Sequence, residues 1–348
     1  MDAQRSNAID YVKFIGIMLM LIGHYPNPLS PILRPYVFHM PLFFFLGGML
    51  VNTDKRRSVF YVSLFKRYFI YIIISYIILG VCADLFHYLF GTQKLNVFSG
   101  LSTFSLALEE NFNNNFFFIT GWFLLSYMLT MALCFPLISW VKKINNETKI
   151  TITLVIIAIL LGIFGMGKVA RMYNHSKIFY INIISQVMVG SCFYILGYVL
   201  RDYAWKIINP VVAFILFIIL MIAIHTNITG ALYMVWSQYK YGFITHMLSV
   251  AAGVYVVLTL ANVMSKWRVI DLFKRIGRNS KSIMIFHLML FTVIDICMSF
   301  ITDYSINPFD IKQHITYFWS FPVNLVFSVL ASMWIGDFLK KLSKGLYA

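Results

Sequence analysis

Residues 9–24 read IDYVKFIGIMLMLIGH and place three ionisable side chains, Asp10, Lys13 and His24, in an otherwise apolar run. An apolar run of roughly 17 to 25 residues is long enough to cross the hydrocarbon core of a bilayer. An ionisable group at the centre of such a helix costs about 2.5 to 3.5 kcal/mol on insertion scales, so it usually has a function. We therefore look for function first in this helix.

The composition indicates a polytopic membrane protein. Of the 348 residues, 60% are hydrophobic and 12% charged, and the mean hydropathy is +0.79, whereas soluble domains carry about 25% charged residues. The net charge of +15 does not indicate nucleic-acid binding, because most Lys and Arg residues fall in alternate loops, as in cytoplasmic loops of membrane proteins. The four cysteines lie in apolar runs without metal-ligand spacing, so we expect core residues and no metal site.

The apolar runs predict an all-α membrane bundle of about ten transmembrane helices, in one integral-membrane domain over residues 1–348. Arg5 precedes the first run as in a signal peptide, but Lys13 interrupts that run and no small-residue cleavage site follows, so we expect a retained span. The alternate basic loops place both termini in the cytoplasm. The expected spans are 9–25, 36–51, 68–90, 117–140, 150–166, 178–200, 208–225, 242–262, 282–302 and 316–339.

Two segments are expected to depart from simple spanning helices. The second span is short and Pro41 lies among its aromatic residues, so we expect it to be tilted or broken. Its Gly47 and Gly48 permit close helix packing. The moderately apolar segment 226–241 is expected to form an interfacial helix.

Lys13 and His24 are 11 residues apart, close to three helical turns, so they share one face about 16 Å apart along the axis. Asp10 is three residues before Lys13 and can pair with it. Such a face can hold a long ligand with an anionic head and a reactive tail, and His24 can act as its general base. Alternatively, Lys13 snorkels to the interface and His24 bonds a loop carbonyl at the membrane rim.

Two further motifs follow. In residues 38–48, FHMPLFFFLGG, His39 precedes the second span, and its simplest interpretation is an interfacial histidine in an aromatic belt. Lys66 and Arg67 stand at the cytoplasmic end of the third span. They are either positive-inside anchors or a site for the phosphates of a cytoplasmic cofactor, for which the arginine fork is well shaped.

Residues 277–287, GRNSKSIMIFH, place a second histidine in the membrane. Asn279 and Ser280 predict a helix N-cap after a basic loop. His287 lies seven residues past Ser280 and therefore on the same helical face, about two turns into the membrane. With Asp295 two turns further on, packing alone explains this histidine poorly.

These motifs, together with Gly121-Trp-Phe-Leu124, resemble acyltransferase family 3, the multispanning membrane O-acyltransferases that modify bacterial surface carbohydrates. Their order and spacing run through most of the chain. The resemblance implies a multi-pass protein of the bacterial cytoplasmic membrane, with no permanently bound cofactor, that transfers an acyl group from acetyl-CoA or another acyl-CoA to a sugar hydroxyl. It places His24 at the family's essential histidine. It also places Lys13 where the family usually has arginine, and Ile70 where a second arginine commonly follows Arg67.

The motifs and the resemblance together predict three groups of residues. His24 would activate the acceptor hydroxyl directly or pass the acyl group on through a covalent intermediate, and His287 would orient His24 or bind the acceptor. The alternative is a transporter or flippase for a lipid-linked sugar, in which intramembrane His and Asp residues relay protons. The predicted residues are catalytic His24 and His287, donor-binding Lys13, Arg67 and Arg278, and supporting Asp10, His39, Trp122, Asn279 and Ser280.

Overall fold

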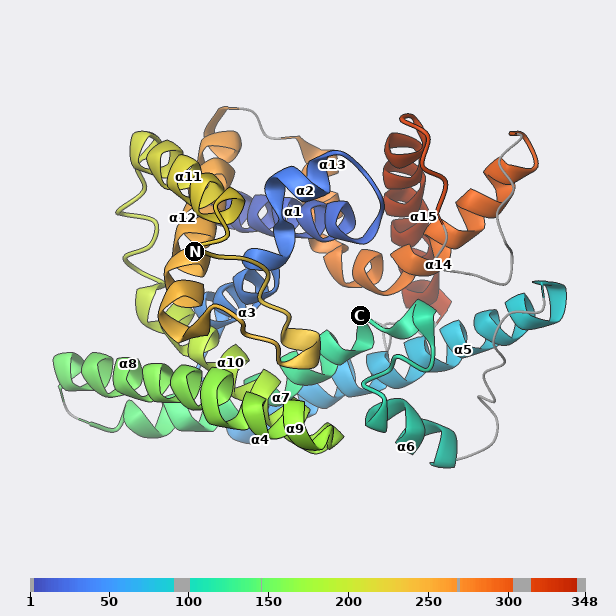
Figure 1. Cartoon of the computed structure of the whole chain (residues 1–348). Coiled ribbons are helices and arrows are strands. Elements are labelled where there is room, and N and C mark those ends of the chain that lie inside the picture. The colour runs from blue at the N-terminus through green and yellow to red at the C-terminus, as the bar shows by residue number, and fades with distance from the viewer. Residues whose placement is uncertain (1–2, 91–100, 145, 268–269, 303–313, 343–348) are drawn as a thin grey trace.

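The computed structural model describes residues 3–90, 101–144, 146–267, 270–302 and 314–342, and the secondary-structure elements in these ranges are helices apart from one isolated bridge (Figure 1). This confirms the predicted all-α class. Within the described ranges, eight helices are long and apolar enough to cross a membrane. Which side of the membrane each terminus faces stays a prediction. The eight are α1 (Ala3–His24), α5 (Ile70–Phe90, preceded by α4, Arg57–Leu64), α7 (Gly121–Val141), α8 (Glu147–Phe164, continued by α9, Ala170–Ser176), α10 (Phe179–Leu200), α12 (Gly242–Trp267), α14 (Ser280–Ser299) and α15 (Ser320–Leu342).

The other two predicted spans form helices of different kinds. The second is broken: α2 (Leu29–Leu33) and a 3-10 turn (Pro35–Val37) meet α3 (His39–Leu50) at a bend of 46°. A tilt or break was predicted from Pro41, but the break falls at Phe38, and Pro41 lies in the first turn of α3. The seventh is α11 (Pro210–His225), an apolar helix of 16 residues. Each predicted span therefore corresponds to helical structure in its own part of the chain.

The prediction of an interfacial helix over 226–241 was wrong. The segment contains a 3-10 turn at Met234–Trp236 and an isolated bridge between Tyr233 and Gln238. Ser237 adopts a left-handed backbone conformation with φ of 47°, which a continuous right-handed helix does not allow. Backbone N–H groups of the segment bond to backbone carbonyls, as Leu232 does to Tyr36 at 3.0 Å, and the carbonyls of Val235 and Ser237 accept hydrogen bonds from side-chain amides outside the segment.

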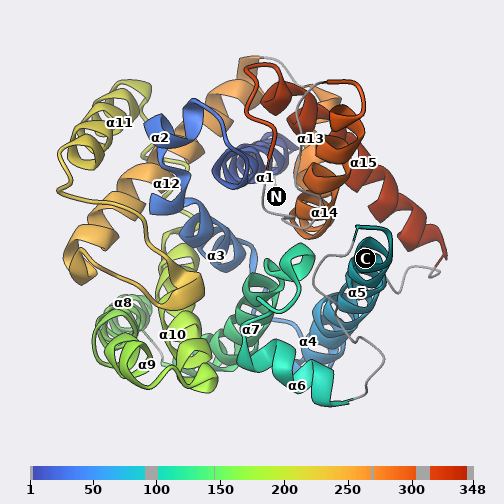
Figure 2. The ribbon, with the colours of Figure 1, turned by 45° about the vertical axis from the view of Figure 1, so that its right-hand side comes forward.

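Helix α1 packs against several other helices of the bundle and contains the candidate residues Asp10, Lys13 and His24. Figure 2 shows α1 nearly end-on, with α3, α12, α14 and the short helix α13 (Asp271–Arg278) around it. Helix α3 in turn packs against α10, and a Cβ atom added at Gly48 would collide with the backbone carbonyl of Tyr194. The predicted close packing at Gly47 and Gly48 is thus confirmed, because only glycine permits this approach.

Candidate active site

The end of α1 brings His24 against His287. His24 is the last residue of α1 and His287 lies in the middle of α14, and their ring centroids are 5.1 Å apart at an interplanar angle of 65°. The ring of Tyr36 lies 5.6 Å from that of His24 and 5.1 Å from that of His39. The two predicted catalytic residues, His24 and His287, are thus neighbours, and the ring of Tyr36 contacts both His24 and His39.

The hydrogen bonds of His287 fix which of its nitrogens can react. Its Nδ1 lies 2.8 Å from the carbonyl of Met284, and because a carbonyl only accepts, Nδ1 must carry the proton. Nε2 is buried and has no hydrogen-bond partner in the described part of the chain. His39 follows the same pattern, with Nδ1 bonded at 2.8 Å to the carbonyl of Pro35. Neutral His287 therefore presents an unshared lone pair on Nε2.

His24 and His39 line a cavity of about 290 Å³ with aromatic walls. Trp122, at the start of α7, forms one side of this histidine cavity, and Tyr36 forms another. Tyr233 and Trp236, from the segment 226–241, line it as well. An apolar, aromatic wall with a few polar groups is typical of a small-molecule site.

A single backbone carbonyl anchors the segment that closes the histidine cavity. The oxygen of Val235 accepts hydrogen bonds from the side-chain amides of Asn111 (2.8 Å), Asn182 (2.9 Å) and Gln186 (2.9 Å). Our sequence reasoning missed this segment. The available signal was the pair Asn182 and Gln186, one turn apart in an otherwise apolar helix, since buried amides need partners.

The opposite part of α1 faces a second cavity, of about 470 Å³, that is rich in basic side chains. The predicted donor-binding residues Lys13, Arg67 and Arg278 all line this cationic cavity, as does Ser280. It also contains two cations that our sequence reasoning had treated only as positive-inside residues, and these are Lys281 and Lys340.

Asp10 holds two of these cations. Its Oδ2 accepts a hydrogen bond from Nε of Arg278 at 2.7 Å, and Lys13 Nζ lies 3.9 Å from its Oδ1. The predicted pairing with Lys13 is confirmed, but Arg278 is the closer partner. Asp10 is buried while the Arg278 side chain is 61% exposed, so the guanidinium, which carries five N–H donors, stays largely accessible while its Nε is bonded to Asp10.

Lys281 is positioned from the other side of the cationic cavity. Its ammonium donates to the backbone carbonyl of Arg67 at 3.1 Å and lies 4.1 Å from the ring centre of Tyr71. The contact joins α14 to the turn before α5, which are far apart in the sequence. The sequence signal was the position of Lys281, directly after the predicted cap at Ser280.

The predicted N-cap position is confirmed, because α14 begins at Ser280 with Asn279 as its N-cap residue, but the Asn279 side chain does not cap α14. Asn279 stands between α13 and α14, but its side-chain amide donates to the carbonyl of Arg275 at 2.9 Å and makes no cap bond to α14. The carbonyl of Arg275 also accepts the backbone N–H of Asn279 at 3.1 Å, so both the backbone and the side chain of Asn279 bond to this end of α13. Asn279 therefore stands at both helix ends: its side chain bonds to α13, and its backbone carbonyl accepts the first helical hydrogen bond of α14, from Ile283 at 3.1 Å.

The two cavities meet at one side chain. Met284 lines both the histidine cavity and the cationic cavity. Helix α1 runs along both, with Lys13 and Ile17 on the cationic side and Met20 and His24 on the histidine side. A long ligand with its charged end near Lys13 can therefore reach His24 along this helix.

In the described residues, no group of three or more His, Cys, Asp and Glu side chains could hold a metal ion. A family model described as an acyltransferase domain matches residues 6–337. No curated protein sequence and no solved structure gave a match to the chain.

Proposed function

Because the chain belongs to acyltransferase family 3, we propose that it is a membrane O-acyltransferase that moves an acyl group, in the first instance acetyl, from acyl-CoA to a hydroxyl of a surface or exported carbohydrate. The single observation that supports this most is the arrangement of the two cavities. One is cationic, the other is lined by His24 and His39, and Met284 lines both.

The cationic cavity suits the phosphates of the donor. Five basic side chains line it, and the buried carboxylate beside it, Asp10, is occupied by Arg278 and Lys13. Charge-assisted hydrogen bonds to phosphate are roughly twice as strong as neutral ones, and arginine binds phosphate through its planar fork. The distance from Lys13 to His24 along α1, about 16 Å, suits the extended phosphopantetheine arm, which would carry the thioester to the histidines.

His24 would act as the general base. It removes the proton from the acceptor hydroxyl as that oxygen attacks the thioester carbonyl, and the departing CoA thiolate then takes the proton from the imidazolium. Nε2 of His287 is a lone-pair acceptor beside it. A hydrogen bond from a ring N–H of His24 to Nε2 would leave the other nitrogen of His24 unprotonated and ready to act. Transfer through an acyl-histidine uses the same two residues.

The histidine cavity suits a carbohydrate acceptor. Tyr36, Trp122, Tyr233 and Trp236 line it, and aromatic rings provide flat apolar surfaces with a polar edge. The C–H face of a sugar ring packs on such a surface, while its hydroxyl groups bond to neighbouring polar atoms. This arrangement would bring an acceptor hydroxyl to His24 from the side opposite the donor.

The test is acyl transfer by the purified protein in lipid vesicles supplied with radiolabelled acetyl-CoA and a membrane glycan extract. His24→Ala is expected to lower the rate about 100-fold or more. His225→Ala is a matched control, since His225 is likewise the last residue of a helix and its Nδ1 bonds a backbone carbonyl; it should leave the rate unchanged. A folded His24→Ala protein with a normal rate would refute the mechanism. Proton-coupled glycolipid uptake without label transfer would support the transporter alternative.

A further inference from the structure

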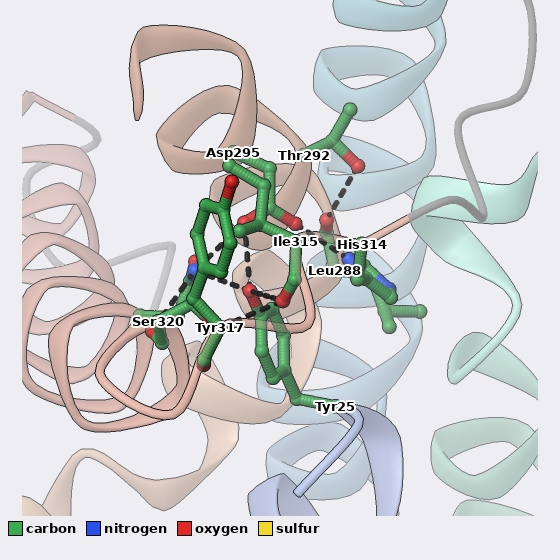
Figure 3. A network of polar contacts seen from close by, with 9 residues as sticks. Tyr25, Leu288, Thr292, Asp295, His314, Ile315, Tyr317 and Ser320 are labelled. Atoms are coloured by element: carbon green, nitrogen blue, oxygen red, sulfur yellow. Dashed lines mark hydrogen bonds and ion pairs between the residues drawn. The ribbon is translucent and has the colours of Figure 1, made fainter. Parts of the chain in front are cut away.

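A buried polar cluster, drawn in Figure 3, begins at the residue after His24 and lines neither the histidine cavity nor the cationic cavity. The hydroxyl of Tyr25, the residue after His24, donates to Oδ1 of Asp295 at 2.7 Å. The other carboxylate oxygen, Oδ2, lies 2.7 Å from Nδ1 of His314. The side-chain amide of Asn324 lies 2.8 Å from both the Tyr25 hydroxyl and Asp295 Oδ1. Asp295 is thus the hub of the cluster.

The cluster ties three parts of the chain together. Tyr25 directly follows α1, Asp295 belongs to α14, and Asn324 belongs to α15. Asp295 is 1% exposed and Asn324 is fully buried. A buried carboxylate is tolerated only when hydrogen bonds replace its water, and removing one partner from such a cluster is strongly unfavourable. The cluster therefore has one well-defined arrangement, which holds the end of α1 to α14 and α15.

This attachment bears directly on the histidine pair. His24 is the last helical residue of α1, so the anchored residue beside it limits where its imidazole can lie. His287 is on α14, about two turns before Asp295. The ring of Phe291 fills the space between, 5.1 Å from the ring of Tyr25 and 5.5 Å from that of His287.

We propose that Asp295 is a positioning residue that, through the hydroxyl of Tyr25, holds the end of α1 so that His24 lies against His287. In the described residues, Asp295 forms no hydrogen bond or ion pair with His24 or His287, so it acts on this pair only by holding the chain in position. Its effect on turnover rests on the proposed function. Its effect on the distance between the two histidine positions does not.

The first test measures that distance without any reaction. In a variant with the four native cysteines replaced, His24→Cys and His287→Cys should be joined by a short bis-methanethiosulfonate reagent, and mass spectrometry reports the yield. Asp295→Ala should abolish most of the cross-link. Asp295→Asn should preserve it, because the amide oxygen still accepts from Tyr25 and Asn324 and the amide nitrogen can donate to the other tautomer of His314. Equal yields with Asp295 and with Asp295→Ala would overturn the proposal.

The second test separates positioning from chemistry. Tyr25→Phe removes only the hydroxyl, and it should lower kcat by about 100-fold, the cost of misplacing a catalytic group by about 1 Å. KM for acetyl-CoA should stay within about threefold, because the cationic cavity is untouched. Tyr25→Phe also keeps the test decisive if Asp295→Ala does not fold.

Asp295→Asn supplies the rescue, and its kcat should stay close to that of the unaltered protein. If Asp295→Asn is as slow as Tyr25→Phe while the cross-link persists, the carboxylate takes part in proton transfer and the positioning role is wrong. Asp54→Asn, at an exposed carboxylate paired with Lys142, is the control and should change neither readout. If the unaltered protein transfers no acyl group, the proposed function fails, but the cross-link still decides the positioning role.

Discussion

Replacing Lys13 with alanine is expected to weaken binding of the acyl donor without slowing the chemical step. Lys13 lines the cationic cavity, and its side chain is 30% exposed. Along α1 it lies about 16 Å from His24, too far for its ammonium to contact the reacting atoms. A contact made equally in the ground state and the transition state affects KM and leaves kcat unchanged.

The size of the effect follows from the surroundings of the ammonium. A hydrogen bond to a charged group contributes about 1.5 to 3 kcal/mol, which corresponds to roughly 10- to 100-fold in affinity. We expect about the lower end, 10-fold, because Lys13 is partly solvated and four other cations line the same cavity. Lys13→Arg keeps the charge beside Asp10 and should change KM by about threefold or less.

The assay compares two donors. Initial rates with acetyl-CoA and with acetyl-pantetheine, which lacks the phosphates and the nucleotide, give kcat and KM for each. Lys13→Ala should raise KM for acetyl-CoA only. Lys66→Ala is the control, since Lys66 is exposed, adjoins Arg67 and lies outside the lining of the cavity. An equal penalty with acetyl-pantetheine, or a lower kcat at unchanged KM, would refute a role of Lys13 in phosphate binding.

Three further changes test the packing and the two cavities. Gly277→Ala places a Cβ against the backbone carbonyl of Asp10, so thermal unfolding in detergent should show a loss of about 1 to 3 kcal/mol; Gly167→Ala, with no atom within 4 Å, should show none, and equal stability of the two variants would contradict the packing. Trp236→Ala should raise KM for the acceptor glycan and leave KM for acetyl-CoA unchanged, and the reverse result would move the acceptor elsewhere. Met284→Ala should allow transfer of longer acyl chains from their CoA thioesters, and an unchanged chain-length profile would show that Met284 does not limit the passage.

Much of the fold could be predicted from local sequence, because bilayer thickness sets the length of each apolar run and its position in the chain is directly readable. An irregular second span was also expected from its short run, but the break falls at Phe38 and not at Pro41. Segment 226–241 was not, because its structure depends on amides of distant helices that bond to one carbonyl, that of Val235. Local composition carries no information about such partners.

The candidate site likewise has some features that the sequence predicts and others that it does not. The shared face of Lys13 and His24 follows from helical periodicity, and the structure places these residues at the two cavities. That Arg278 is the closer partner of Asp10, at 2.7 Å, depends on how α13 packs against α1. Spacing along one helix does not encode a contact between two helices. The same reason explains why Lys281 was counted only as a positive-inside residue.

At the junction between the two cavities, the backbone of Met284 is bonded to His287, while the Met284 side chain lines both cavities. The backbone carbonyl of Met284 accepts hydrogen bonds from both the Thr120 hydroxyl (3.0 Å) and Nδ1 of His287 (2.8 Å). The backbone at this point is therefore held by the residue before α7 and by the histidine itself. Only the unbranched side chain of Met284, with its several rotatable bonds, remains free to change the width of the passage. A methionine at this position can adapt to the arriving acyl chain while His287 keeps its tautomer, so passage of the donor need not disturb the histidine pair.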